Sequence, residues 1–247
     1  MEKILKVLIQ QNRSQDISVL QRRFANYIEP LQELFPIGKE TDDLLYGLKL
    51  LFTYCTYQDK IIDAIHTTED CFLALYFENA YLKWLTPYGI SAIKRYVRSI
   101  KRYLSYTKKE RNSYENFLYK IDNYLEKEQP IVEHLTLLLE RFGEKYEKKI
   151  ALVKSYYLAV LLIDDVEDIL EDVVARHTTL MTYWLTRQGV DLKKLLPQSR
   201  QYWLYVNDFL SPWLLEQLKK FSLFKETKIY KLLLSIYENI QYKLQTE

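Results

Sequence analysis

Hydrophobic residues recur three and four positions apart along most of the chain, which is the spacing of amphipathic α-helices. The first segment, for example, places Ile4, Leu5 and Leu8 on one face. Short polar stretches separate such segments, so each segment is predicted as a helix with its own ends. Helices are predicted over residues 2–12, 17–35, 44–66, 68–84, 90–106, 113–126, 129–142, 156–179, 180–189, 191–196, 202–221 and 227–245.

Capping and breaking residues set several helix ends. Thr67 or Thr68 can cap the helix that follows it, and Pro130 suits the first turn of its helix. Residues 87–89 form a turn, and Gly189 closes the helix before it. Further breaks are expected at Gly38, Pro197 and Pro212, and Gly143 either ends its helix or lets it bend into the next.

Composition supports one all-α domain. The 247 residues include only 5 glycines and 6 prolines, and 48% of them are hydrophobic. Few helix breakers and abundant apolar residues favour helices around a full core and exclude a disordered chain. No linker, low-complexity run or block of like charge divides the chain. We therefore predict a single domain over residues 1–247, built from about ten helices.

Charge and cysteine content narrow the function class. The formal net charge of +2 gives no general attraction to nucleic acid. Cys55 and Cys71 match no zinc-binding spacing, which indicates a reducing, cytoplasmic setting. The N-terminal residues lack the apolar core of a signal peptide, and no segment approaches the ~20 apolar residues of a membrane span. A cytoplasmic protein without a transmembrane segment is expected.

An unusually dense group of acids follows a buried-type segment. The apolar run from Tyr156 to Ile163 leads directly into six acidic residues. On a helix, positions i, i+4 and i+8 share a face. Carboxylates placed against apolar surroundings need a proton, a partner or a metal ion. The acids are Asp164, Asp165, Glu167, Asp168, Glu171 and Asp172.

A smaller acidic pair lies upstream. Asp59 and Asp63 are four residues apart and flank Ile61 and Ile62 in another apolar helix. An isolated pair of this kind usually marks a solvent-facing helix side. Together with the downstream group, however, it predicts two acidic faces that lie opposite each other and bind Mg²⁺ or Mn²⁺ between them.

The two motifs resemble those of a known superfamily. Asp164-Asp165-Val166-Glu167-Asp168 is a complete DDxxD motif and is similar to the second aspartate-rich motif of class I isoprenoid synthases. These include trans-prenyltransferases, terpene cyclases and squalene or phytoene synthases. Asp59-Lys60-Ile61-Ile62-Asp63 resembles the first motif, with Lys60 replacing its second aspartate. The squalene and phytoene synthase branch uses DxxxD here.

The resemblance implies a fold and a reaction. The fold would be a helical bundle of the isoprenoid synthase type with a central active-site cavity. Metal ions would bind a prenyl diphosphate, which ionises to an allylic cation for cyclisation or prenyl transfer. The implied metal ligands are Asp59, Asp63, Asp164, Asp165, Asp168 and Asp172; Arg176 would contact the diphosphate, and Tyr57 and Tyr157 would line the cation pocket. Oligomeric state is left open, a homodimer included.

Other classes remain to be weighed. Asn207, Ser211 and Glu216 come near the metal triad of terpene cyclases, but one spacing differs and we interpret them as structural. The main alternative is a non-catalytic helical protein of isoprenoid synthase descent that acts as a partner or binding subunit. Lys60 is the strongest argument for it. We expect Lys60 to turn away from the site, because a DxxxD pair can bind Mg²⁺ without it.

Overall fold

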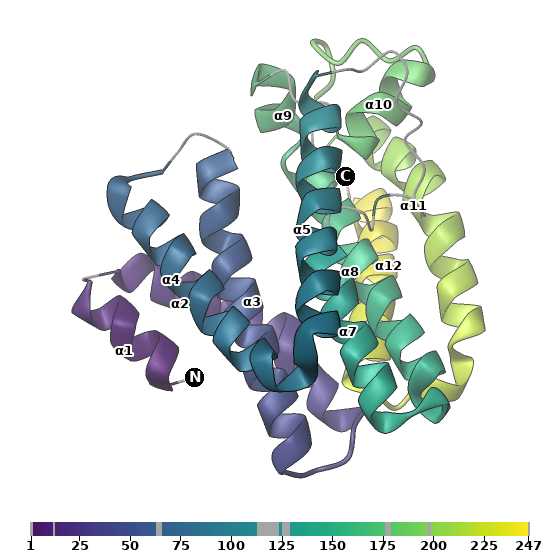
Figure 1. Cartoon of the computed structure of the whole chain (residues 1–247). Coiled ribbons are helices and arrows are strands. Elements are labelled where there is room, and N and C mark those ends of the chain that lie inside the picture. Colours follow the sequence, from purple (N-terminus) through teal and green to yellow (C-terminus); the bar gives the residue numbers. More distant parts are fainter. Residues whose placement is uncertain are drawn as a thin grey trace. The chain divides into compact units, whose positions relative to one another are not determined.

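The computed structural model describes residues 2–11, 13–62, 66–112, 124, 129–175, 179–196 and 199–246. All regular elements in these ranges are helices (Figure 1), which confirms the all-α prediction. Contacts divide the chain into two compact units, Met1–Ile100 with Pro130–Gly143 and Lys101–Gln129 with Glu144–Glu247. A single domain of the isoprenoid synthase type with a central cavity stays a prediction.

The first unit is built around one helix pair. Helices α3 and α4 pack against each other, and the rings of Tyr57 and Phe77 stack between them with centroids 6.1 Å apart. Leu48 and Leu73 are fully buried in the same unit. Its elements are α1 (Glu2–Gln10), α2 (Ser14–Arg23), η1 (Phe24–Ile28), η2 (Glu29–Glu33), α3 (Lys39–Ile62), α4 (Thr68–Leu85), η3 (Thr86–Tyr88), α7 (Gln129–Phe142) and the first half of α5 (Gly89–Asn112).

The second unit is organised around α8. This helix contacts α10, α11 and α12, and α11 packs along α12. Leu152 and Leu162 of α8, Val206 of α11 and Leu233 of α12 are fully buried in its core. Its elements are η5 (Glu144–Tyr146), α8 (Glu147–Glu167), α9 (Ile169–Ala175), α10 (Leu180–Arg187), α11 (Arg200–Lys220), η6 (Ser222–Phe224) and α12 (Lys228–Thr246).

Several helix ends lie where local signals placed them. Thr67 caps α4 through a capping box with Asp70, in which each side chain accepts a hydrogen bond from the other's backbone N–H. The helix α7 begins beside Pro130 and ends at Gly143, whose φ of +83° is the left-handed conformation that glycine adopts most readily. Gly189, with φ of +75°, follows α10 in the same way.

Two stretches differ from the predicted helices. Residues 17–35 do not form one α-helix; a π-helical turn and a 3₁₀ turn follow α2. Pro30 has no N–H to donate to a preceding carbonyl, which removes one α-helical hydrogen bond and favours the change to a 3₁₀ turn. Residues 191–196 form turns with isolated i→i+3 bonds. Six residues without a packed face are too few to offset the cost of nucleating a helix.

Two further differences concern helix breaks. The helix α11 continues through Pro212, although a break is expected there, because buried Leu210 and Leu214 on either side hold it in the core. In contrast, the predicted helix over 156–179 is interrupted at Asp168, between α8 and α9. The predicted helix over 113–126 lies outside the described residues except for Tyr124.

A glycine allows one close approach in the core of the first unit. A Cβ atom at Gly47 of α3 would lie 2.5 Å from two ring atoms of Trp84. The Trp84 ring cannot retreat easily, because it stacks on His134 at 5.1 Å and on Tyr81 at 5.5 Å. Glycine is therefore required at this position of the α3–α4 contact.

Gly47→Ala is expected to lower the free energy of unfolding by about 2 kcal/mol, since the cost of overpacking exceeds the roughly 1 kcal/mol by which alanine favours a helix. Urea denaturation measures this change. Gly38→Ala is the matched control, because a Cβ at Gly38 meets nothing within 4 Å. Equal stability of the two variants would contradict the steric account.

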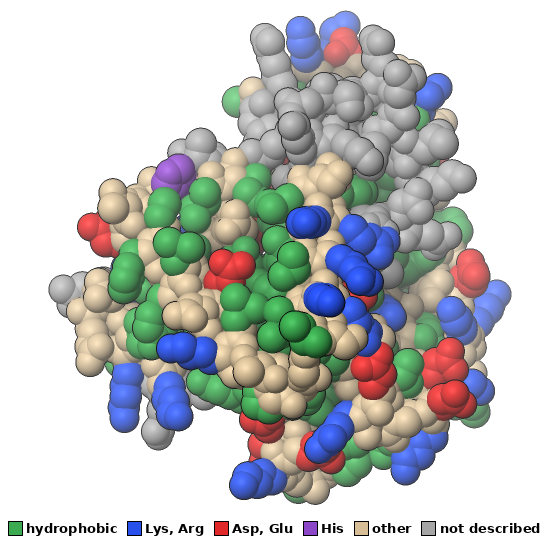
Figure 2. Space-filling model, viewed as in Figure 1, with side chains coloured by type: hydrophobic (Ala, Val, Ile, Leu, Met, Phe, Trp, Pro, Cys, Tyr) green, Lys and Arg blue, Asp and Glu red, His purple; other side chains and the backbone are tan. Residues whose placement is uncertain are grey.

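The outer side of α4 and α5 carries exposed apolar residues. Phe72 is 56% exposed, Leu75 67% and Ile90 72%. Figure 2 shows hydrophobic side chains gathered over these helices, with Lys and Arg side chains beside them. In the described part of the chain, no helix is long and apolar enough to span a lipid bilayer.

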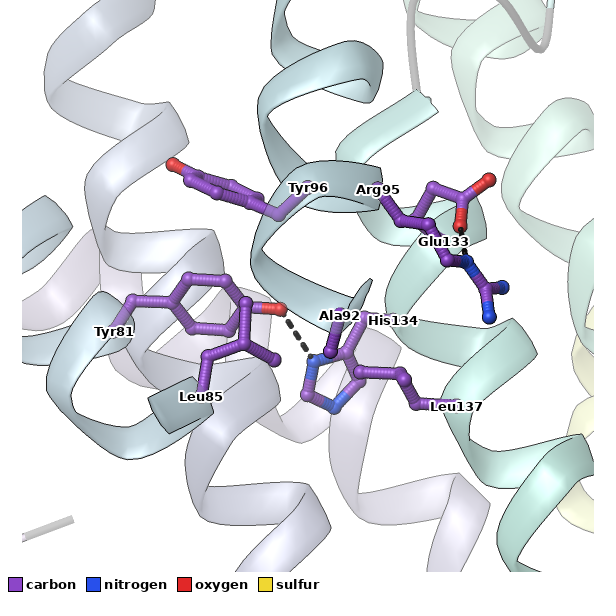
Figure 3. A pocket seen from close by; sticks show the side chains of 8 residues that line it. All are labelled: Tyr81, Leu85, Ala92, Arg95, Tyr96, Glu133, His134 and Leu137. Atoms are coloured by element: carbon purple, nitrogen blue, oxygen red, sulfur yellow. Dashed lines mark hydrogen bonds and ion pairs between the residues drawn. The ribbon is translucent and has the colours of Figure 1, made fainter. Parts of the chain in front are cut away.

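A buried histidine joins α3, α4 and α7. His134 is fully buried; its Nε2–H donates to the carbonyl of Leu44 at 2.9 Å, and its Nδ1 accepts from the hydroxyl of Tyr81 at 3.1 Å (Figure 3). Burial lowers the pKa of His134 to about 4, although the hydrogen bond to Leu44 and the charge of Asp43 act in the opposite direction. His134 is therefore a neutral core residue with both nitrogens satisfied.

Candidate acidic site

The downstream acidic group lies where α8 gives way to α9. The N–H of Asp168 donates to the carbonyl of Asp164 at 2.9 Å, and the N–H of Asp172 donates to that of Asp168 at 3.0 Å. These i→i+4 bonds continue the helical register across the interruption. Asp164, Asp168 and Asp172 therefore follow one another along one side of the segment, as the sequence predicts.

Two tyrosines from elsewhere in the second unit hold the end of α8. The Tyr124 hydroxyl donates to Oδ2 of Asp165, which is 7% exposed. The Tyr202 hydroxyl of α11 donates to the carbonyl of Val166. Burial, followed by the charges of Asp165 and Asp172, raises the pKa of Tyr202, so its hydroxyl remains a donor at neutral pH. These contacts fix the backbone from which the acids project.

Like charge is concentrated at this point. Burial and the charges of Asp164 and Asp168 raise the pKa of Glu167 above its ordinary value. The direction of this shift shows that adding negative charge here is unfavourable. A bound cation would reverse that effect, because it stabilises the ionised forms of the carboxylates around it.

The donor chemistry fits Mg²⁺ only in part. Carboxylate oxygens are its preferred ligands, and it commonly takes one or two of them together with waters and phosphate oxygens. Asp164 and Asp168 offer such a pair. Within the described residues, however, no three Asp, Glu, His or Cys side chains come together as a group able to hold a metal ion. The acids would therefore need a ligand such as a diphosphate to complete the coordination.

The upstream motif belongs to the first unit. Asp59 is half-buried near the end of α3, whereas Asp63 lies outside the described residues, as does Arg176 after α9. The predicted opposition of two acidic faces and the role of Arg176 at a diphosphate both stay predictions.

The two tyrosines expected in a cation pocket are core residues. Tyr57 of α3 is fully buried, and its hydroxyl donates to Oδ2 of Asp16 at 2.9 Å. Burial and the hydrogen bond to Asp16 raise the pKa of Tyr57. Tyr157 of α8 is 4% exposed and lies beside Tyr156.

Lys60 is part of an ion-pair cluster of Arg13, Asp16, Lys60 and Asp70. Its ammonium lies 2.8 Å from Oδ1 of Asp16 and 3.6 Å from Oδ1 of Asp70. Arg13 pairs with the same two aspartates. Neither aspartate belongs to a predicted motif, so the Lys60 side chain is directed at a structural cluster. Through these ion pairs the cluster connects the start of α2 with α3 and α4.

No pattern in the sequence predicts this ion-pair cluster. Asp16 falls in the polar break before the second helix, and Asp70 forms part of a capping signal. Burial alone would raise the pKa of both carboxyls, but their hydrogen bonds and the charges of Lys60 and Arg13 lower it below its ordinary value. Both aspartates are therefore ionised in the folded protein at neutral pH.

The near-match to a cyclase metal triad is engaged in helix packing. Gln241 of α12 donates through Nε2 to Oδ1 of Asn207 at 2.7 Å and to Oγ of Ser211 at 3.3 Å. Glu216 is exposed on the same helix, α11. These contacts agree with the structural interpretation of Asn207 and Ser211.

Comparison with known proteins adds no assignment. No protein-family model matches the chain, and neither a curated protein nor a solved structure is significantly similar to it.

Proposed function

We propose that the acidic segment at the α8–α9 junction binds Mg²⁺ or Mn²⁺ and, through the metal, the diphosphate group of a prenyl substrate. The observation that carries this proposal is that Asp164, Asp168 and Asp172 follow one another along one side of the segment. Burial, followed by the charges of Asp164 and Asp168, also raises the pKa of Glu167, and a bound cation would relieve this crowding of like charge. The resemblance of this DDxxD segment to class I isoprenoid synthases supports the substrate class.

The proposed activity is ionisation of the prenyl diphosphate to an allylic cation for cyclisation or prenyl transfer. Bound Mg²⁺ would supply Lewis-acid stabilisation of the leaving diphosphate. Asp164 and Asp168 would hold the metal, with Asp172 one turn further along the segment. Asp165 accepts a hydrogen bond from Tyr124 and is buried, so its proposed role is to position the end of α8. Arg176 would balance the leaving charge.

Asp164→Asn and Asp168→Asn are each expected to abolish Mg²⁺-dependent pyrophosphate release from geranyl, farnesyl or geranylgeranyl diphosphate. Each removes a charged oxygen ligand while keeping the side-chain shape. The metal-free variants should melt at the same temperature as the unaltered protein or higher, because like charge is relieved. A pyrophosphate assay and a thermal melt measure the two effects.

Asp208→Asn on α11 is the matched control, because Asp208 is exposed and belongs to a different helix. It should leave pyrophosphate release unchanged. Full activity in both Asp164→Asn and Asp168→Asn would refute the metal-binding role of this segment.

A non-catalytic binding subunit is the second candidate. The observation that favours it is Lys60, which replaces the second aspartate of the first prenyltransferase motif and whose ammonium pairs with Asp16 and Asp70. A binding subunit would show a higher melting temperature with Mg²⁺ and a prenyl diphosphate, but no pyrophosphate release. Pyrophosphate release together with a higher melting temperature supports the enzyme. If neither the melting temperature nor pyrophosphate release responds, both candidates are contradicted.

A further inference from the structure

A second surface, on the first unit, has properties that the acidic site does not use. We define the α4–α5 face by its exposed residues Phe72, Leu75, Tyr76, Lys83, Ile90, Lys94, Val97 and Arg98. The two helices contact each other through Tyr96 of α5, whose ring centroid lies 5.0 Å from that of Tyr81 and whose hydroxyl donates to Glu78. Figure 2 shows hydrophobic and basic side chains together over these helices.

The apolar side chains of this face protrude from both helices. Phe72, Leu75 and Tyr76 occupy positions i, i+3 and i+4 of α4 and are 56%, 67% and 43% exposed. Ile90 and Val97, seven residues apart on α5, are 72% and 43% exposed. Large apolar side chains that cluster on a surface mark a place of interaction, whereas single ones do not.

The charge of the same face is mainly positive. From the start of α4 to Ile100, the exposed charged residues are the three basic side chains of Lys83, Lys94 and Arg98 and one acid, Glu69, in the first turn of α4. The acidic side chains nearby are engaged: Glu78 accepts from Tyr96, and Glu133 and the more exposed Glu140 both pair with Arg95. The chain as a whole is nearly neutral, at +2. The face is therefore complementary to an anionic partner.

The shape of the face favours a lipid surface over a partner helix. A helix docks its apolar side chains into a groove. The pocket lined by Tyr81, Arg95 and His134 beside this face has room for only about one water molecule (Figure 3). What the face offers is protruding phenylalanine, leucine and isoleucine side chains with lysine and arginine beside them, which is the composition of surfaces that insert shallowly between anionic lipid headgroups.

We propose that the α4–α5 face docks this protein on anionic lipid membranes, with Phe72, Leu75 and Ile90 inserted at the headgroup level and Lys83, Lys94 and Arg98 contacting lipid phosphate and carboxylate groups. The docking uses the first unit alone and is independent of the function proposed for the acidic site.

Co-sedimentation of the full chain with vesicles tests this docking. The protein should bind vesicles of phosphatidylcholine and phosphatidylserine, and should bind vesicles of phosphatidylcholine alone far more weakly. Lys94→Ala with Arg98→Ala should weaken the binding about 25-fold, at about fivefold for each charge removed. Raising the NaCl concentration from 50 to 300 mM, both chosen conditions, should weaken it further, because salt screens surface charge.

Phe72→Ser with Leu75→Ser tests the insertion and should weaken binding about tenfold or more. The variant lacks the two apolar side chains that are transferred from water into the membrane on binding. Lys219→Ala with Lys225→Ala, two exposed lysines of the second unit, is the matched control and should keep the affinity. Circular dichroism verifies that each variant is folded.

Absence of binding to anionic vesicles would overturn the proposal. A second outcome would also overturn it: the Phe72/Leu75 variant still binds anionic vesicles, and poly-glutamate displaces the protein from them as readily as free lipid vesicles do. The face would then recognise an acidic polymer by charge alone.

Discussion

Asp70→Ala is expected to lower the free energy of unfolding by about 3 kcal/mol, combining a broken buried ion pair with a lost helix cap. Asp70 is 2% exposed and accepts hydrogen bonds from the N–H of Thr67 at 2.8 Å and from its hydroxyl at 2.9 Å. It also pairs with Arg13 and Lys60. Its removal leaves two cations facing each other with Asp16 as their remaining shared partner.

Glu69→Ala is the matched control for this prediction. Glu69 lies in the same first turn of α4 but is exposed, so its removal should cost less than about 0.5 kcal/mol. A double-mutant cycle between Asp70→Ala and Lys60→Ala measures the coupling of the pair. A cost for Asp70→Ala no larger than that for Glu69→Ala would show that the cluster does not stabilise the fold.

The cluster also bears on the departure of Lys60 from the isoprenoid synthase pattern. Lys60→Ala should leave any diphosphate-dependent activity largely intact, because the ammonium is directed at Asp16 and Asp70. Its loss would instead reduce stability. A stability effect without an activity effect is what distinguishes a structural lysine from one that contacts the diphosphate.

Helices with strong local signals were predictable from the sequence. The start of α4 follows from a threonine cap with an acid three residues later, and the end of α7 from a glycine that adopts a positive φ. Both depend only on residues within one turn of the helix end. The all-α class follows for the same reason, since the apolar period persists throughout the chain.

Features that depend on distant residues were not predictable. The interruption at Asp168 lies beside Val166, whose carbonyl accepts from Tyr202, and no pattern within the helix contains that partner. Lys60 likewise pairs with an aspartate 44 residues earlier in the chain. At the acidic site the register of Asp164, Asp168 and Asp172 was predictable, but the support of Asp165 by Tyr124 was not, because it joins separate segments.

Acid is expected to destabilise the first unit over a pH range that the titration of His134 determines. The folded protein keeps this side chain neutral, with its pKa lowered to about 4 by burial, whereas the ordinary value is 6.5. As pH falls below 6.5, the unfolded chain takes up a proton that the folded chain does not. Stability is therefore complete above that value and declines as pH falls toward 4, by about 3 kcal/mol in total.

The aspartates of the ion-pair cluster act in a separate window. Their pKa values are lowered from 3.8, so their contribution is present above that value and is lost only at still lower pH. Between pH 6.5 and 4, the loss of stability should therefore follow His134 rather than Asp16 or Asp70.

His134→Gln isolates the effect, because an amide can still donate to the carbonyl of Leu44 but does not titrate. The variant should be less stable than the unaltered protein at pH 7, since it loses the aromatic contacts with Trp84 and Tyr81. Its free energy of unfolding, measured by urea denaturation at intervals from pH 7 to pH 4, should nevertheless decline less steeply. The difference in slope should correspond to about one proton fewer taken up on unfolding. Parallel profiles for the two proteins would mean that His134 is not the group that takes up the proton on unfolding.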